Sequence, residues 1–278
     1  MFDNKTIGFI GSGNLAEALI NGLIASEAAS PGQILAADRV AERLLHLAET
    51  YEVKVCSKNF EVARSADIIF ITVKPGDVDG VLKEIAPELT EDKLLISVAA
   101  GITTGRIIES LNSGGIKRLV PVIRAMPNTP VIVREGVTVI TAGAGAGGED
   151  IELAENIFGA VGKVLFLEDE SLMDAVTGLS GSGPAYIFLF MEALIEAGVK
   201  AGIPGEKALS MVLQTVAGSA RLALESGKDL AELRRMVTSP GGTTAEGVKR
   251  LEDGGLRKIV KEAVTAAAKR SRELSSGS

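Results

Sequence analysis

A glycine-rich turn near the N-terminus has the spacing of a phosphate-binding loop. The run Gly11-Ser12-Gly13-Asn14-Leu15-Ala16 matches the pattern G-x-G-x-x-G/A, between an apolar run that predicts a strand and a periodic run that predicts a helix. The first glycine of this pattern permits a tight turn, and the second lets the backbone approach a pyrophosphate. Free N–H groups at the helix start then face the phosphates. The turn therefore predicts dinucleotide binding, with contacts from Ile10, Gly11, Ser12, Gly13, Asn14 and Leu15.

The residues after the second predicted strand bear on the choice between NADH and NADPH. Asp38 is an acidic residue of the kind that accepts the adenosine ribose hydroxyls and repels a 2′-phosphate. The adjacent Arg39 can do the opposite, or lie flat on the adenine. Asn59 adds a polar contact near the same ribose. The sequence therefore leaves both cofactors open.

Further candidates follow strands that end at the same edge of a parallel sheet, where such sheets bind their cofactors. Lys74 follows the fourth predicted strand and is either a catalytic cation or a solvated loop charge. Small residues end the fifth strand and leave space for a nicotinamide ribose, and a stiff Met-Pro-Asn-Thr-Pro run ends the sixth. The cofactor-binding residues expected here are Thr72, Val73, Lys74, Pro75, Ala99, Ala100 and Asn128.

A second glycine-containing loop, residues 238–244, joins two predicted helices. Thr243 and Glu246 fit the capping box S/T-x-x-E. The exposed N–H groups and the positive end of the helix form a small anion site. A capped helix with no further role is the alternative, but capping alone does not need two glycines and two hydroxyls. We predict that a substrate carboxylate binds Ser239, Gly241, Gly242, Thr243 and Thr244.

The composition excludes several other kinds of chemistry. The chain has one cysteine, Cys56, and one histidine, His46, which excludes an intramolecular disulfide and the usual His/Cys zinc sites. His46 lies on a probable helix face and is expected to be structural. Net charge is −7, and no basic face for nucleic acid is evident. A bound organic cofactor is the natural source of reactivity, and we predict no metal.

The elements that position these residues divide the chain in two. In residues 1–167, short continuous apolar runs are separated by helical patterns. This predicts an α/β Rossmann-type domain with a mostly parallel sheet that is covered on both faces. The predicted helices here are Leu15–Ser26, Ala41–Tyr51 and Val78–Ile85. The predicted strands are Lys5–Ile10, Ile34–Asp38, Val53–Val55, Ile68–Val73, Leu94–Val98, Leu119–Arg124, Val137–Thr141 and Val164–Leu167.

Residues 168–278 read as an all-helical domain for substrate binding and dimerisation. The helices are apolar around much of their circumference, more than one small domain can bury, so we expect a homo-oligomer. No uninterrupted apolar run reaches the roughly 18 residues that span a bilayer, and no signal peptide precedes the first strand. A cytoplasmic protein without a membrane or nucleic-acid partner is expected. The predicted helices are 183–202, 204–227, 229–237, 243–253 and 256–273, and 178–184 is expected to be a glycine-rich turn.

Six runs of residues together carry a family resemblance. They are Gly8–Asn14, Val73–Pro75, Ala99–Gly101, MPNTP at 126–130, TGLSGSGPAY at 177–186 and VTSPGGTT at 237–244. In these runs the chain resembles pyrroline-5-carboxylate reductases, collinearly over nearly its whole length. The resemblance implies reduction of 1-pyrroline-5-carboxylate to L-proline by NADPH or NADH, and a dimer with interleaved helical domains that often assembles into a decamer. Asp38 departs from the many members that look adapted to NADP.

A mechanism follows that needs neither histidine nor cysteine. A protonated cyclic imine accepts hydride without a strong general acid, so positioning and electrostatics supply most of the rate. Thr244 is expected to hydrogen-bond the ring nitrogen. A 3-hydroxyacid dehydrogenase is one alternative, but its G-x-x-x-K pattern, counted from Gly183, gives Ile187 in place of the lysine. A non-catalytic dinucleotide sensor is the other, and the second anion-binding loop disfavours it.

Overall fold

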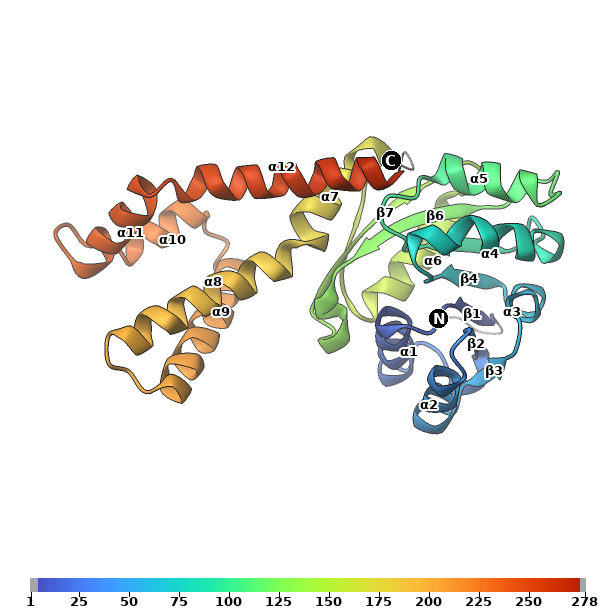
Figure 1. Cartoon of the computed structure of the whole chain (residues 1–278), viewed down its shortest axis with the longest axis horizontal. Coiled ribbons are helices and arrows are strands. Elements are labelled where there is room, and N and C mark those ends of the chain that lie inside the picture. Colours follow the sequence, from blue (N-terminus) through green and yellow to red (C-terminus); the bar gives the residue numbers. More distant parts are fainter. Residues whose placement is uncertain (1–4, 276–278) are drawn as a thin grey trace. The chain divides into compact units, whose positions relative to one another are not determined.

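A twisted eight-stranded sheet is the framework of the N-terminal part of the computed structural model, which describes residues 5–275 (Figure 1). The strand order is β3-β2-β1-β4-β5-β6-β7-β8, and all neighbours are parallel except the antiparallel pair β6 and β7. The order reverses beside β1, where doubly wound sheets form their binding crevice. The strands are β1 (Ile7–Ile10), β2 (Ile34–Ala37), β3 (Lys54–Cys56), β4 (Ile68–Ile71), β5 (Leu94–Ser97), β6 (Val122–Pro127), β7 (Gly136–Ala142) and β8 (Gly162–Phe166).

Helices cover both faces of this sheet, which confirms the predicted α/β fold. Helices α1, α2 and α6 pack on one face, where Phe70 stacks on Phe9 at 4.8 Å and meets Phe158 edge-on at 5.8 Å. Helices α3, α4 and α5 pack on the other face. Strands β1, β2, β4 and β5 are buried throughout, which explains their unalternated apolar sequences. The helices are α1 (Asn14–Ala25), α2 (Ala41–Tyr51), α3 (Asn59–Ser65), α4 (Val78–Ile85), α5 (Thr104–Ser113) and α6 (Gly148–Gly159).

Some predicted boundaries were wrong. Strand β6 begins at Val122 and not at Leu119, because Pro121 has no N–H to donate to the ladder. Helices α3, α5 and α6 were not predicted. The segment 178–184 is not a turn: a 3-10 turn (Glu170–Leu172), α7 (Met173–Val176) and a π-helical turn (Thr177–Gly181) lead into α8.

The chain forms two compact units. The first contains residues 1–182 and 266–278, and the second contains residues 183–265. The end of α12 belongs to the first unit because Ser271, which is buried, donates a 2.6 Å hydrogen bond to Asp174. The change from strands to helices occurs after β8, but the division into compact units falls later. A functional boundary at 167/168 therefore stays a prediction.

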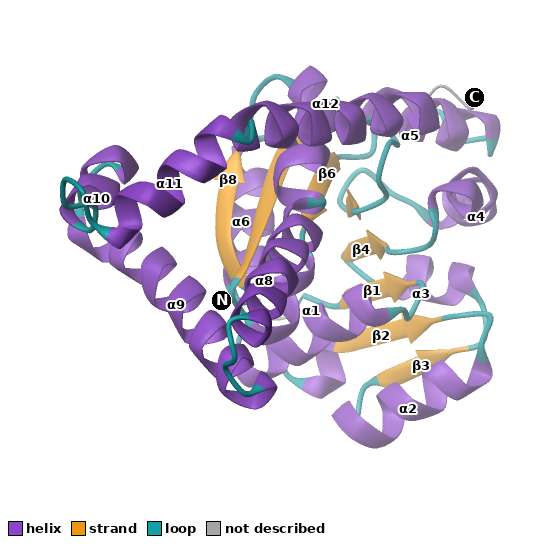
Figure 2. Cartoon of the chain, turned by 60° about the vertical axis from the view of Figure 1, so that its left-hand side comes forward, coloured by secondary structure: helices purple, strands orange, loops and turns teal. Residues whose placement is uncertain are grey.

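The regular elements of the second unit are all helices, joined by short turns (Figure 2). Helices α8 and α9 pack against each other, and Asp229 caps α10 by accepting a 2.7 Å hydrogen bond from the N–H of Glu232. Large apolar side chains stay exposed, Leu189 at 67% and Leu224 at 86%. The helices therefore do not bury their own apolar residues. They are α8 (Gly183–Lys200), α9 (Gly205–Ser226), α10 (Leu230–Met236), α11 (Thr243–Asp253) and α12 (Leu256–Ser275).

One helical stretch in the described part of the chain, Glu170–Lys200, is long and apolar enough to cross a membrane by length and composition alone. This criterion differs from the count of uninterrupted apolar residues, which no run of about 18 satisfies because charged residues are spread along these 31 positions. Only 6% of its most apolar window is buried within the chain. The stretch therefore exposes apolar side chains that another surface would bury.

Candidate active site

A cavity of about 590 Å³ lies at the edge of the sheet where β1, β2 and β4 end. It brings together eight of the sequence-predicted cofactor residues, namely Gly11, Gly13, Asp38, Arg39, Asn59, Thr72, Val73 and Lys74. It is also lined by Val40, Asp77, Gly80, Val81 and Glu84, which sequence reasoning missed. The available signal was their place in the chain: Val40 directly follows Asp38 and Arg39, and the other four precede or belong to α4, the helix that follows β4. Ile10, Ser12, Asn14, Leu15, Pro75, Ala99, Ala100 and Asn128 do not line it.

The glycine-rich turn has the geometry that its sequence predicts. Gly11 has φ +99°, and a Cβ there would lie 2.8 Å from the Thr72 carbonyl carbon. The Thr72 hydroxyl donates to the Gly11 carbonyl at 2.6 Å, so the residue that follows β4 holds the turn. A Cβ on Gly13, by contrast, would meet nothing within 4 Å. The backbone at Gly13, directly before α1, therefore faces open space large enough for a ligand to approach.

The peptide groups on both sides of Ser12 are held by charged side chains. The Ser12 N–H donates to Asp38 Oδ2 at 2.5 Å, and Asp38 Oδ1 accepts from the Val40 N–H at 2.9 Å. Arg43 Nε donates to the Ser12 carbonyl at 2.8 Å. Arg43 was not identified from the sequence, because the contact joins residues 31 positions apart. Asp38 thus fixes the turn as well as lining the cavity.

A polar cluster on α1 and α2 supports Arg43. Glu17 accepts hydrogen bonds from Arg43 at 2.6 Å and Tyr51 at 3.3 Å, and lies 2.8 Å from His46 Nε2. Burial raises the pKa of Glu17, but the hydrogen bonds from His46 and Arg43 outweigh it and lower that pKa overall. His46 therefore has a structural contact outside the cavity, as predicted. Burial, with Glu61 nearby, raises the pKa of the Cys56 thiol, which does not favour a nucleophile.

The residues at the ends of β5 and β6 pack inside the first unit and do not line the cavity. Ala99 is buried, and Ala100 packs against the cluster of Met126, Val139 and Met173. Asn128 Oδ1 accepts a 2.9 Å hydrogen bond from the Val137 N–H and so fixes the loop before β7. The structure therefore does not bring these three predicted residues to the cavity.

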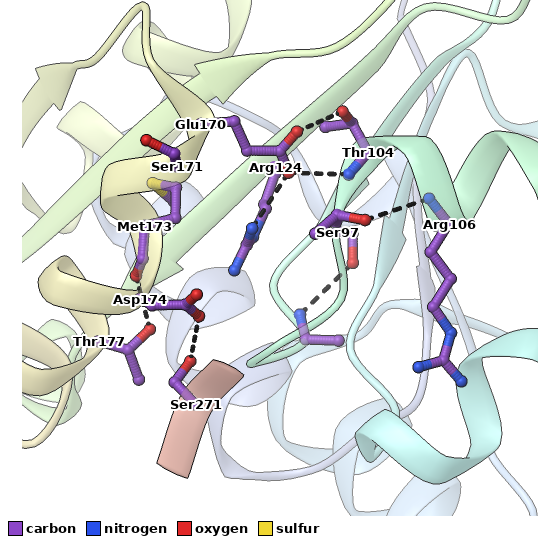
Figure 3. A network of polar contacts seen from close by, with 12 residues as sticks. Ser97, Thr104, Arg106, Arg124, Glu170, Ser171, Met173, Asp174, Thr177 and Ser271 are labelled. Atoms are coloured by element: carbon purple, nitrogen blue, oxygen red, sulfur yellow. Dashed lines mark hydrogen bonds and ion pairs between the residues drawn. The ribbon is translucent and has the colours of Figure 1, made fainter. Parts of the chain in front are cut away.

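A buried arginine joins β6 to two other elements of the first unit (Figure 3). Arg124 is 2% exposed, and its Nη1 donates to Glu170 at 3.1 Å. Glu170 also accepts from the Thr104 N–H at 2.8 Å and from its hydroxyl at 2.6 Å, at the start of α5. Neither Nε nor Nη2 of Arg124 has a hydrogen-bond partner in the described part of the chain. No sequence motif pointed to this network.

The second predicted binding loop is a tight turn before α11. Gly241 has φ +69°, and the Gly242 N–H donates to the Ser239 carbonyl at 3.0 Å, as in a type II turn. The capping-box prediction was wrong. Gly242 is the N-cap, and its carbonyl accepts from Ala245 and Glu246, so Thr243 is already the first helical residue.

This turn leaves polar groups available to a ligand within the second unit. Thr243 and Thr244 are exposed, and the first N–H groups of a helix have no partner within it. An added Cβ on Gly242 would lie 2.5 Å from the Ser239 hydroxyl, which can rotate away, so the glycine that the turn requires is Gly241, with its positive φ. The segment can accept an anion at its N–H groups and offers two adjacent hydroxyls.

Within residues 5–275, no group of three or more His, Cys, Asp or Glu residues could hold a metal ion. The chemistry of both binding segments instead consists of backbone N–H groups, hydroxyls and isolated charges. That set of groups suits phosphates and carboxylates.

Comparison with known proteins identifies relatives over nearly the whole chain. Residues 170–274 match the family described as pyrroline-5-carboxylate reductase dimerisation, and residues 6–101 match NADP oxidoreductase, coenzyme F420-dependent. The pyrroline-5-carboxylate reductases of Arabidopsis thaliana and Escherichia coli are 46% and 42% identical to it, over 97% and 98% of this chain and 95% and 98% of theirs.

Solved structures of pyrroline-5-carboxylate reductases have the same fold as this chain. The pyrroline-5-carboxylate reductase from Coxiella burnetii superposes with a TM-score of 0.90 at 41% identity, and that of Plasmodium falciparum, with NADP bound, at 0.87 and 32%. Both alignments cover 98% of this chain and 98% of the other. Identity at this level along both units shows that the chain belongs to the pyrroline-5-carboxylate reductase family.

Proposed function

We propose that the chain reduces 1-pyrroline-5-carboxylate to L-proline by hydride transfer from NADH or NADPH, the final step of proline biosynthesis. The family is one of NAD(P)H-dependent oxidoreductases. The observation that carries the proposal is that three strand ends bring a glycine-rich turn, the acidic residue Asp38 and Lys74 to one cavity.

The residues around the cavity fit a dinucleotide. The backbone N–H groups at Gly13 and the start of α1 would hold the pyrophosphate, in the open space next to Gly13. Asp38 and Arg39 would meet the adenosine ribose, with Asn59 nearby. Thr72, Val73, Lys74 and Pro75 would border the nicotinamide side, with Ala99, Ala100 and Asn128 further along the sheet edge. The bound cofactor supplies the hydride.

The turn before α11 would hold the substrate. Backbone N–H groups at Thr243 and Thr244, with the positive end of α11, would stabilise the substrate carboxylate, while the Gly242 N–H closes the turn on the Ser239 carbonyl. The Thr244 hydroxyl would hydrogen-bond the ring nitrogen and orient the C=N bond for hydride addition at its carbon. Lys74 is the second proposed catalytic residue, because it is an exposed cation at the end of β4 that lines the cavity.

We further propose a homodimer built through the helical segment 170–274. The apolar side chains of Glu170–Lys200 would be covered by the second copy, and we propose no membrane or nucleic-acid partner and a cytoplasmic location. Assembly of five dimers into a decamer, as the family resemblance implies, is part of the same proposal.

A substrate comparison tests the proposal. We expect the absorbance of reduced nicotinamide to fall on addition of 1-pyrroline-5-carboxylate, and to stay constant with keto acids. Oxidised cofactor should likewise stay oxidised with 3-hydroxyacids. Turnover of 3-hydroxyacids, or binding of cofactor without any turnover, would instead support one of the alternatives, a hydroxyacid dehydrogenase or a sensor.

A further inference from the structure

The charges at one end of the cavity do not suit a 2′-phosphate. Three carboxylates, on Asp38, Asp77 and Glu84, line the cavity, against the two cations Arg39 and Lys74. Asp38 and Arg39 follow β2, which is where a doubly wound sheet places the adenosine ribose. Asn59, near the edge strand β3, donates a 2.8 Å hydrogen bond to Glu84, which locates Glu84 at this same end.

Among the residues that line the cavity, the cation at this end, Arg39, is already paired. Arg39 Nη2 donates to Asp77 Oδ2 at 2.9 Å, across 38 positions of sequence, and the Arg39 side chain is 82% exposed. Asp77 directly precedes α4, and it makes no side-chain capping bond there. The carboxylate therefore interacts with the guanidinium and is not needed to begin the helix.

The geometry points to Asp77 as a specificity-determining residue: by holding Arg39, it makes the cavity select a cofactor whose adenosine ribose carries no phosphate. This inference rests on the proposed function, because it assumes that the cofactor binds in this cavity. A 2′-phosphate would have to displace Asp77 from Arg39 and lie beside Asp38, whose carboxylate is fixed by the Ser12 and Val40 N–H groups. Free ribose hydroxyls need only an acceptor, which Asp38 supplies.

Titration calorimetry with ADP-ribose and 2′-phospho-ADP-ribose isolates the adenosine end, since neither probe carries the nicotinamide. We expect the unmodified full-length chain to bind ADP-ribose at least about tenfold more tightly, from the like-charge repulsion at partly exposed carboxylates. In Asp77→Asn, the affinity for 2′-phospho-ADP-ribose should rise about fivefold, the scale of one exposed ion pair, while that for ADP-ribose changes less than about twofold.

Two further variants show whether a gain in affinity for 2′-phospho-ADP-ribose comes from releasing Arg39 or from removing one negative charge from the cavity. Glu84→Gln removes the same charge from the same cavity but from a partner of Asn59, so it measures the general effect of charge, and its gain in binding of 2′-phospho-ADP-ribose, about twofold, should be smaller than that of Asp77→Asn. Arg39→Gln in the Asp77→Asn background should abolish the gain.

The inference is overturned if Asp77→Asn leaves the ratio of the two affinities unchanged, if Glu84→Gln matches its effect, or if the gain persists without Arg39. A chain that binds neither probe would contradict the proposed cofactor site as well. Binding of both probes with no effect of Asp77→Asn would contradict this inference alone.

Discussion

At the scale of single residues, the two adjacent threonines of α11 have different expected roles. Both are exposed, and neither caps the helix, because Gly242 does. Thr244→Val keeps the shape and removes the proposed hydrogen bond to the ring nitrogen. We expect kcat/KM for the imine to fall about ten- to a thousandfold, with unchanged melting temperature and cofactor affinity. Thr243→Val is the matched control and should change kcat/KM much less. Equal effects of the two substitutions would contradict the role given to Thr244.

The glycine-rich turn provides a second matched pair. Gly13→Val should abolish cofactor binding in a folded protein, because its side chain would occupy open space where the pyrophosphate is proposed to lie. Gly11→Ala should instead destabilise the fold by about 2 kcal/mol, because φ is +99° and the new Cβ would meet the Thr72 backbone. Fluorescence titration and thermal melting distinguish the two outcomes. A folded Gly13→Val that binds cofactor normally would remove this turn from the site.

Residues in a local pattern were predictable, and residues that meet across the fold were not. The turn at Gly11–Gly13 could be identified because its spacing and its neighbouring elements are contiguous in sequence. Arg43 and Asp77 act on residues 31 and 38 positions away, so no spacing indicates them. The capping box failed for another reason. Gly242, with an extended backbone, is the N-cap of α11, so Thr243 is already helical and its side chain cannot cap the helix.

At the scale of elements, the Arg124–Glu170–Thr104 network ties β6 to α5 and to the segment before α7 (Figure 3). Glu170→Ala would leave a guanidinium that is 2% exposed without its carboxylate and would free the start of α5. We expect a loss of about 2 to 3 kcal/mol in the free energy of unfolding, measured by urea denaturation. Glu168→Ala, at an exposed position nearby, should cost less than about 0.5 kcal/mol. Similar losses in the two variants would show that the network contributes little.

The contact between α4 and α5 should respond to acid. The hydrogen bond from Arg106 lowers the pKa of Asp79 below its ordinary value of 3.8. A lowered folded-state pKa means that the stabilisation is complete well above pH 3.8 and is lost as the pH falls through the folded value. Asp79→Asn should therefore be less stable than the unmodified chain at neutral pH, and the difference in melting temperature should shrink below pH 3.8. A difference independent of pH would show that the charge of Asp79 has no part in it.

The elements that could be predicted are those whose burial leaves a clear pattern. Strands β1, β2, β4 and β5 lie inside the sheet, with helices on both faces. Their sequences are therefore continuously apolar, without the alternation of a strand that has one exposed face. Helix α3 is only seven residues long, so its periodicity is too short to detect. The glycines of 178–184 predict a turn, whereas Thr177–Gly181 is a π-helical turn in which Gly178 is buried and Gly181 faces Met126.

At the scale of the whole molecule, the exposed apolar surface predicts self-association. Leu189, Leu224 and Leu230 are each at least 67% exposed on helices that match a dimerisation family. Burial of such side chains is favourable by about 1.5 to 3 kcal/mol each. We expect light scattering on the full-length chain to give the mass of a dimer or a multiple of it at micromolar concentration. A stable monomer there would contradict the proposed assembly.

The division of the molecule was less predictable than its fold class. The sequence changes from strands to helices near residue 168, but the compact unit extends to Ser182 and takes in the end of α12. That packing depends on contacts such as the one between Ser271 and Asp174, 97 positions apart, which local periodicity does not encode.

The central claim is that this chain transfers hydride from its cofactor to the imine carbon of 1-pyrroline-5-carboxylate. The most direct test supplies NADH and NADPH that carry deuterium at the transferable position and examines the product by NMR. We predict L-proline with one deuterium at the ring carbon that formed the C=N bond. Proline without the label, or no proline with either cofactor, would contradict the claim.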